Sequence, residues 1–590
     1  MAVHPKLETW WRRASELLAA GDHAHAVREL ERLVKAAPQE SAFRYNLSAC
    51  LFQLGKLDDA LLHLRRARQL GLADPAADVL FERIATQFHA ENRLDDAIAL
   101  QREVLAKWPN DTMRLLRFCE LLREAGHFAE ALDLLSRIRG SGREEAYVQN
   151  ALGLTRQNMG ALDAAQTHFA RALEIDPMLA MTHKNIRYLT LNRPGLNPDE
   201  TFDLYRDLAR RSAASSFPFK FDARPAANGR ALRIAYVSSD FRMHVVGLNI
   251  LPLIENHDPS AVELFFYSDV AQEDQITQRF KVRAKSWRSI VGLSDAEAAA
   301  TIRSDNIDVA IFLAGSFDAN RAQIAAYRVA PVQASYHDCA TSGFDAMDYF
   351  ISDDLLTPSD TPEKFSETIY RLPVFYQYEK REIPAAPPEP PCLKAGFVTF
   401  GSFNKPEKIN SDVIALWARV LSFVPRSRLL LKYFDFYKGA EAQSRIVTEF
   451  EKHGVEPGRL LFKAGFDASG AHLSLYDSID IALDTFPFTG ATTTFEALNR
   501  GVPVVTLWGD RYVARYAGAI VTHAGRADFA CANADAYVAL ARSLASDSER
   551  LRTLKRTLPA QISASALCDG AAYARNMEKA YLELWSRSLA

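Results

Sequence analysis

The sequence predicts an α-helical repeat superhelix followed by two α/β lobes of the Rossmann-like kind. Three observations support this fold class. A short motif recurs through the N-terminal third, β-branched apolar runs then alternate with helical patterns, and a proline-rich segment, PAAPPEPP, divides the alternating part in two. At 590 residues the chain is too long for one hydrophobic core. We therefore expect a repeat array over 1–190, a linker helix and boundary over 191–230, a first lobe over 231–385 and a second lobe over 386–590.

The repeat array is predicted from five recurrences, of which GKLDDA at Gly55 is typical. Small residues close these motifs at spacings of 34, 37, 34 and 34, namely Ala26, Ala60, Ala97, Ala131 and Ala165. Prolines keep the same register and are expected to end the second helix of each unit: Pro38, Pro75, Pro109 and Pro177. An irregular helical bundle would not produce this spacing five times, and the pattern resembles the tetratricopeptide repeat. Stacks of such repeats bind extended peptides or proteins on their concave face, so the array implies a protein partner.

Composition argues against several other classes of function. The formal net charge of −3 and the absence of an Arg-rich run speak against a nucleic-acid partner. The N-terminus has no apolar signal region and no apolar run approaches a membrane span, so we expect no membrane partner and a cytoplasmic location. The six cysteines are widely spaced, which predicts reduced thiols and no metal site.

An anion site is predicted in the stretch from Ile481 to Gly509, which has the pattern of strand, turn-rich loop, helix and strand. The N-terminus of a helix offers unpaired backbone N–H groups to a phosphate, and threonine hydroxyls add further donors. A carboxylate one turn later could accept hydrogen bonds from a ribose. The threonines could equally be ordinary helix caps. The residues assigned to this site are Gly490, Thr492, Thr493, Thr494 and Glu496.

Two lysines and a histidine of the second lobe are further candidates for binding a nucleotide. Lys405 and Lys408 lie in the loop between the strand expected over 396–403 and the helix expected over 411–421. An ammonium group in such a loop can neutralise a phosphate, whereas on an open surface it is merely solvated. His472 begins a short helix before the anion site, where an imidazole could stack on a nucleobase or have a structural role.

The first lobe contributes candidate catalytic residues at the ends of its expected strands, over 232–238, 263–268 and 308–313. Ligands in parallel sheets bind outside the carboxyl ends of the strands. Asp240 and His244 lie in the first such loop, where the histidine could be a general base, could orient a sugar, or could simply hold the loop. His337 and Asp338 form a second candidate pair in a later loop.

Four strings extend these observations: YVSSDFRMH, APVQASYHDCATSGFDAMDYFISD, FGSFNKPEKI and ALDTFPFTGATTTFEAL. Together with the repeats, they resemble the O-GlcNAc transferase/SPINDLY family over nearly the whole chain. The resemblance implies a GT-B-type glycosyltransferase that moves a sugar from a nucleotide donor to serine or threonine hydroxyls of proteins. It further implies inversion at the anomeric carbon, with no metal and no cofactor beyond the nucleotide-sugar co-substrate.

The resemblance also implies roles for individual residues. The family pattern places His244 near the sugar, Lys408 on the diphosphate, His472 against the base, Thr492 and Thr493 on the donor phosphates and Glu496 on the ribose. The general base stays open among His244, Asp240, His337 and a phosphate of the donor itself.

Several positions depart from the family pattern. In SYHDCATSG, His337, Asp338 and Cys339 replace a Gly/Pro-rich string, and the loop AGSFDAN differs from the usual AGHTAGN-like form. Asp308 and Ala491 stand where histidines are found in animal O-GlcNAc transferases. We therefore treat Asp308, His337 and Asp338 as candidate contacts of the donor sugar or the acceptor. The donor stays open among UDP-GlcNAc, GDP-fucose and a CMP-linked nonulosonic acid, the last with flagellin as acceptor.

A rival hypothesis from another class is a repeat scaffold whose transferase half has lost catalysis and senses sugar nucleotides. The replaced histidines motivate it. Transfer to a lipid or small molecule fits less well, because protein-binding repeats would then have no purpose.

Overall fold

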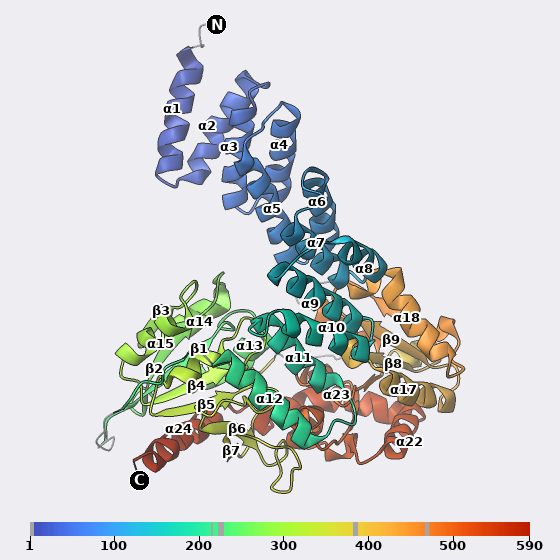
Figure 1. The fold of residues 1–590 in the computed structure, drawn as a ribbon. Helices are drawn as coiled ribbons and strands as arrows, with labels where there is room; N and C mark the ends of the chain where they lie inside the picture. The colour runs from blue at the N-terminus through green and yellow to red at the C-terminus, as the bar shows by residue number, and fades with distance from the viewer. Residues whose placement is uncertain (1–4, 214–215, 222–228, 382–387, 466–470, 590) are drawn as a thin grey trace. The chain divides into compact units, whose positions relative to one another are not determined.

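The computed structural model describes residues 5–213, 216–221, 229–381, 388–465 and 471–589, and its helices and strands are drawn in Figure 1. The chain forms two compact units. The first contains residues up to 155 together with 434–443 and 464–465, and the second contains the rest of the described chain.

The first unit consists of paired helices, as the repeats predict. Its helices are α1 (Pro5–Ala19), α2 (His23–Ala36), α3 (Ser41–Gln53), α4 (Leu57–Gln69), α5 (Pro75–Ala90), α6 (Leu94–Lys107), α7 (Thr112–Glu124), α8 (Phe128–Arg137) and most of α9 (Arg143–Asn158). The recurring alanines Ala26, Ala60, Ala97 and Ala131 are fully buried, so neighbouring helices approach closely there. The turns before α2, α4, α6 and α8 contain residues in the left-handed region: Gly21, Gly55, Asn92 and Gly126. These observations confirm the repeat prediction.

One part of that prediction is wrong. Pro75 does not end a helix but is the first residue of α5, where Asp74 caps the helix by accepting a hydrogen bond from Ala76 N at 2.8 Å. Proline is favoured at this position because the first N–H of a helix has no intrahelical partner. Pro38 and Pro109 do follow the ends of α2 and α6.

The second unit begins with the end of α9 and three further helices, α10 (Leu162–Ile175), α11 (Ala180–Asn192) and α12 (Pro198–Ser212). Ala165 in α10 is fully buried, like its counterparts in the first unit. Packing thus separates the chain near residue 155, earlier than the end of the repeat pattern near residue 190.

The first lobe is a seven-stranded parallel sheet in the order β3-β2-β1-β4-β5-β6-β7. Its strands are β1 (Leu232–Ser238), β2 (Val262–Ser268), β3 (Ser286–Ser289), β4 (Val309–Leu313), β5 (Val332–Tyr336), β6 (Tyr349–Asp353) and β7 (Thr368–Leu372). Its helices are α13 (Val245–Asn256), α14 (Gln275–Arg283) and α15 (Asp295–Ser304). The C-terminal helix α24 (Gly570–Arg587) packs back on this lobe, where Glu578 accepts a hydrogen bond from His257 at 2.9 Å.

The second lobe is a six-stranded parallel sheet in the order β10-β9-β8-β11-β12-β13. Its strands are β8 (Thr399–Ser402), β9 (Arg428–Lys432), β10 (Leu460–Lys463), β11 (Ile481–Leu483), β12 (Val504–Leu507) and β13 (Ala530–Cys531). Its helices are α16 (Cys392–Ala395), α17 (Ser411–Phe423), α18 (Ala440–Glu451), α19 (Ala471–Ser474), α20 (Thr492–Asn499), α21 (Tyr516–His523), α22 (Ala534–Ala545) and α23 (Ser548–Ser563). The two Rossmann-like lobes of the prediction are confirmed.

Both strand orders reverse direction at one point, between β1 and β4 in the first sheet and between β8 and β11 in the second. At such a point the connections leave to opposite sides of the sheet and open a crevice at the carboxyl ends of the two strands. Ligand-binding residues are therefore expected in the loops after β1, β4, β8 and β11. Within the described residues, no helix is long and apolar enough to cross a membrane.

Candidate active site

His244 lies at the reversal point of the first sheet, as the N-cap of α13. Its Nδ1 accepts a hydrogen bond from Val246 N at 3.4 Å and lies 3.5 Å from Asp240 Oδ1. Its Nε2 lies 3.3 Å from Asp318 Oδ2, which comes from the loop after β4. The imidazole is therefore held between two carboxylates at the carboxyl ends of neighbouring strands.

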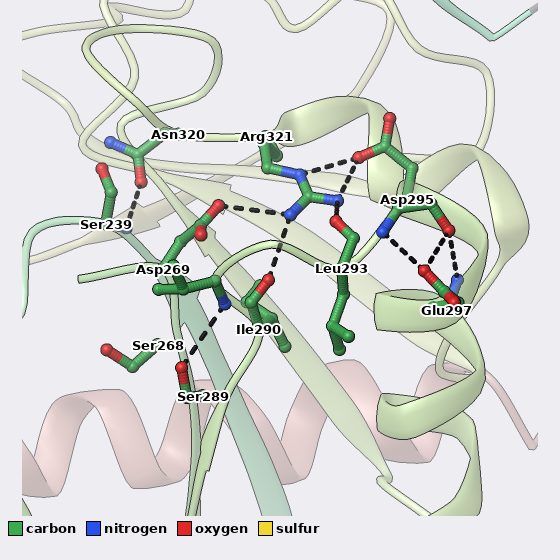
Figure 2. A network of polar contacts seen from close by, with 12 residues as sticks. Ser239, Ser268, Asp269, Ser289, Ile290, Leu293, Asp295, Glu297, Asn320 and Arg321 are labelled. Atoms are coloured by element: carbon green, nitrogen blue, oxygen red, sulfur yellow. Dashed lines mark hydrogen bonds and ion pairs between the residues drawn. The ribbon is translucent and has the colours of Figure 1, made fainter. Parts of the chain in front are cut away.

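Asp240 stands behind His244 and is completely buried. Its carboxylate accepts hydrogen bonds from Asn320 Nδ2 at 2.7 Å and Ser239 Oγ at 3.1 Å, and burial raises the pKa of this carboxyl. Asn320 in turn accepts from Ser239 N, a contact visible in Figure 2. Asp240 is thus buried behind His244, and its assignment as a general base stays a prediction.

Asp318 is a site residue that the sequence prediction did not include. Its side chain is 53% exposed, and the hydrogen bond to His244 holds the pKa of its carboxyl near 2. Its backbone lies in the left-handed region, with φ of 50°. The sequence pattern placed the loop 314–320, with its unusual AGSFDAN, at the carboxyl ends of the strands like the His244 loop, but nothing in it singled out Asp318.

Lys408 lies at the reversal point of the second sheet, in the loop after β8. Its Nζ donates to Thr489 O at 2.9 Å and lies 3.6 Å from the centre of the Phe488 ring. The side chain is buried, and desolvation lowers its pKa to about 8 despite the attraction of Asp484. At neutral pH most of the population keeps a charged ammonium group here, with N–H capacity beyond its bond to Thr489.

The N-terminus of α20 lies in the same crevice. Ala491 at its N-cap has no side chain that could accept from the first N–H groups, so these groups can serve an external anion. Thr493 Oγ1 donates to Asn404 at 3.1 Å, and Thr494 Oγ1 donates to Gly490 O at 3.0 Å. A side chain at Gly490 would come within 2.6 Å of Thr493 Oγ1, so glycine is needed for this turn. The structure thus brings the predicted Gly490–Thr494 loop to the mouth of the Lys408 crevice.

Glu496 lies one turn further along α20 and is mostly buried. It accepts a hydrogen bond from the Tyr476 hydroxyl at 3.3 Å, and Arg381 lies 3.7 Å from its other oxygen. Neither neighbour was predicted as a site residue. A ribose bound to this carboxylate would therefore meet Arg381 and Tyr476 as well.

Residues from both lobes and from α11 meet around Lys405. Its Nζ lies 5.5 Å from the centre of the Tyr188 ring, which comes from α11. Tyr188 in turn packs edge-on against Phe317 of the first lobe and Phe488 of the second, with ring centres 6.2 and 6.3 Å apart. The loops after β4 and β11 are thus bridged by one aromatic ring beside a lysine.

His337 and Asp338 follow β5 and are both buried. The His337 ring packs 4.8 Å from that of Phe375, and burial lowers its pKa to about 3, so it is neutral at physiological pH. Asp338 accepts from Cys339 N at 2.7 Å and lies directly under Gly315. Asp338 therefore packs against the loop after β4 at Gly315, and its assignment as a sugar or acceptor contact stays a prediction.

Asp308 is also outside the crevice. It precedes β4 and so lies at the amino edge of the sheet, opposite the carboxyl ends that carry His244. Its buried carboxylate pairs with Arg230 and accepts from Arg233 N at 2.9 Å. The structure therefore does not bring Asp308 together with His244, and a sugar or acceptor contact at Asp308 stays a prediction. The side chain of His472, in α19, lies outside the described residues.

Comparison with known proteins agrees with this architecture. A family model described as glycosyl transferase family 41 matches residues 208–382 and 392–577, and tetratricopeptide repeat models match 12–77, 88–154 and 146–177. A solved structure of an O-GlcNAc transferase mutant from Thermobaculum terrenum superimposes with a TM-score of 0.69 at 27% identity, covering 100% of this chain and 99% of that one. The likeness of both whole chains supports the predicted GT-B-type arrangement.

Curated relatives include plant proteins named probable UDP-N-acetylglucosamine--peptide N-acetylglucosaminyltransferase SPINDLY. The one from Solanum lycopersicum is 35% identical over 422 residues, 70% of this chain and 45% of its own. The one from Petunia hybrida is 37% identical over 365 residues, 61% of this chain and 39% of its own. The chain thus spans less than half the length of these relatives. With the family match over most of its length, the chain belongs to glycosyl transferase family 41 and has tetratricopeptide repeats in its N-terminal part.

Proposed function

We propose that the protein transfers a sugar from a nucleotide donor to a serine or threonine hydroxyl of a protein acceptor recruited by the repeat array. The observation that supports this most directly is that candidate catalytic and phosphate-binding groups lie at the reversal points of both sheets, where ligands of such sheets bind. The His244–Asp318 pair stands at one, and Lys408 with the N-terminus of α20 stands at the other. The names of the relatives, which describe peptide glycosyltransferases, agree with the proposal.

The proposed reaction is a single displacement. The acceptor oxygen attacks the anomeric carbon while the bond from that carbon to the donor phosphate breaks, which inverts the configuration. The negative charge that develops on the departing nucleotide is stabilised by Lys408 and by the free N–H groups of α20. Fixed positive groups in a crevice of this kind stabilise such charge more than water does, since they need no reorientation during the reaction.

His244 is the proposed acceptor of the hydroxyl proton, with Nε2 as the receiving atom. Nε2 can take this proton only in the tautomer whose own proton is on Nδ1, where it faces Asp240 Oδ1 at 3.5 Å, and the acceptor hydroxyl must replace Asp318 at Nε2. Proton transfer would leave an imidazolium with Asp318 on one side and Asp240 on the other. The carboxylates of Asp240 and Asp318 would stabilise this imidazolium, and this is the role that we propose for both in the proton transfer.

The donor is proposed from the family alone and stays among UDP-GlcNAc, GDP-fucose and a CMP-linked nonulosonic acid, the last with flagellin as acceptor. Metal independence is part of the same proposal. Asp240, His244 and Asp318 have ligand atoms within 4.8 Å of one another, and the hydrogen bonds among these side chains are sufficient to explain that grouping. EDTA should therefore leave the rate unchanged, whereas inhibition that added Mg²⁺ or Mn²⁺ reverses would refute this part.

We also propose a cytoplasmic location. All six cysteines are free thiols, as expected in a reducing compartment.

Asp318→Asn and His244→Gln test the proposed function. Each should lower kcat by about 10²- to 10⁴-fold, the range for loss of general acid–base catalysis, and should leave the affinity for nucleotide nearly unchanged. Asp308→Asn is the matched control, because it removes a buried carboxylate of the same lobe at the opposite edge of the sheet. It should reduce stability and keep kcat. Nucleotide binding without any turnover in the wild-type chain would favour the sensing scaffold instead.

A further inference from the structure

Helix α11, at the end of the repeat pattern, contacts the loop that carries Asp318. Lys184 on this helix directs its ammonium group at two backbone carbonyls, those of Asp318 at 3.0 Å and Asn320 at 3.1 Å. Burial lowers the pKa of this lysine while nearby Asp318 opposes the shift. A charged donor shared by two carbonyls of one turn forms a clamp on that turn.

The turn itself needs such a restraint. Ala314, Gly315 and Asp318 all have φ between 50° and 56°, a region that is strained for a residue with a side chain. A strained turn of this kind persists only where surrounding contacts determine it. The hydrogen bond that Asp318 accepts from His244 therefore depends on what holds the turn.

The lower side of the turn is held within the first lobe. Asn320 binds Ser238, Ser239 and Asp240 through its carboxamide. Figure 2 shows the next residue, Arg321, reaching Asp269, Asp295 and the carbonyls of Ile290 and Leu293. These bonds fix the end of the loop at 320–321. Lys184 adds the contact to the Asp318 carbonyl, which lies two residues earlier.

The same helix contacts neighbouring parts of the crevice. Arg187 donates to the carbonyls of Thr341 at 2.6 Å and Ser342 at 3.0 Å, in the loop after β5. Tyr188 packs on Phe317, the residue before Asp318. Arg511 of the second lobe donates to the Thr190 carbonyl at 2.8 Å, near the C-terminal end of the helix. Since α11 is fixed at these points, it can serve as a rigid support for Lys184.

We propose that Lys184 is a positioning residue for transfer: from α11, the helix that follows the last matched repeat, it clamps the Asp318 turn, so that the carboxylate meets His244 Nε2. This inference rests on the proposed role of the His244–Asp318 pair. It gives α11 a direct part in shaping the active site, separate from any part that the repeats have in recruiting an acceptor.

Lys184→Met tests the clamp. Loss of the ammonium should lower kcat about 10- to 100-fold, since a displacement of about 1 Å at a catalytic group can cost about 10²-fold, while KM for the donor stays within about twofold. Amide hydrogen exchange in a peptide covering 314–321 should become faster, because the turn opens more often. Lys184→Arg keeps a cation and should retain most of both properties. Lys364→Met is the matched control, since Lys364 pairs with Asp199 of α12 on the surface and should show neither effect.

A double-mutant cycle separates positioning from general stabilisation. If Lys184 acts through Asp318, Lys184→Met should hardly lower kcat further in a chain that already has Asp318→Asn. If the two residues act independently, their fold-losses in kcat should multiply. The proposal is overturned if Lys184→Met keeps the wild-type kcat and the wild-type amide exchange rate over 314–321. It is also overturned if the losses in kcat caused by the two substitutions multiply. If Lys184→Met does not fold, Lys184→Gln replaces it in the same measurements. An inactive wild-type chain would refute the proposed function, and the exchange experiment would still decide whether the clamp exists.

Discussion

Replacing Lys408 by methionine should abolish most activity and stabilise the fold at the same time. The methionine keeps much of the apolar contact with Phe488 but removes the ammonium that lies in the crevice. Loss of one preorganised group of this kind typically lowers kcat by about 10²- to 10³-fold, which corresponds to about 3–4 kcal/mol of transition-state stabilisation. Nucleotide affinity should fall as well, because the same charge faces the bound phosphates.

The gain in stability follows from the lowered pKa of Lys408. Burial lowers it from 10.5 to about 8, so below pH 8 the folded state holds this proton less tightly than the unfolded state does. That difference corresponds to roughly 3 kcal/mol against folding, partly offset in the variant by loss of the hydrogen bond to Thr489. The advantage of the variant should be largest below pH 8 and should shrink as the pH rises toward 10.5.

Steady-state transfer kinetics and urea unfolding at pH 7 and pH 9.5 measure both effects. Lys555→Met is the matched control, because Lys555 is also buried but its ammonium pairs with Asp477 at 3.0 Å. Burial lowers the pKa of Lys555 too, so this variant should also gain stability at pH 7, but it should leave kcat unchanged. The reasoning is refuted if Lys408→Met retains wild-type kcat, or if it destabilises the chain at pH 7.

Three further predictions concern other parts of the molecule. Thr493→Val should weaken nucleotide binding about tenfold in calorimetry, since it removes a hydroxyl at the anion site, while Thr493→Ser should not. Ala97→Leu overpacks a fully buried helix crossing and should cost about 1–3 kcal/mol in urea unfolding without changing nucleotide affinity; an unchanged midpoint would contradict the repeat packing. Asp338→Asn should stabilise the chain at pH 8 much more than at pH 4, because burial raises the pKa of this carboxyl from 3.8 to about 6, so its ionisation opposes folding increasingly between these pH values and fully above pH 6; equal effects at both pH values would argue against it.

The parts of the fold that the sequence predicted are those with strong local patterns. The recurring alanines identified the helix crossings, and the apolar run of β1 matched its observed bounds. β3, β6, β7 and β13 were not predicted; β3 and β7 have partly exposed residues that form no apolar run, and β13 has two residues. Strands of this kind are specified by pairing with a neighbour, which a local pattern does not contain.

The site shows the same division between local and distant information. The Gly490–Thr494 loop and Lys408 were predicted, since a phosphate-binding turn is encoded within a few residues. Asp318 was missed because it meets His244 only through the pairing of β1 with β4, across a separation of more than 70 residues. Asp308 shows the converse: it was chosen because it departs from the family pattern, and its place before β4 puts it at the amino edge of the sheet, away from His244.

The measurement that tests the central claim most directly is transfer itself. The purified chain would be incubated with UDP-GlcNAc, GDP-fucose or a CMP-linked nonulosonic acid and with protein extract from cells that lack it, with flagellin as a separate acceptor. Mass spectrometry would then locate sugars on serine and threonine. We predict that the wild type transfers sugar from one of these donors. Asp318→Asn should transfer far less, and Asp308→Asn should transfer as much as the wild type. Binding of a nucleotide without transfer from any donor, or equal transfer by Asp318→Asn, would contradict the account.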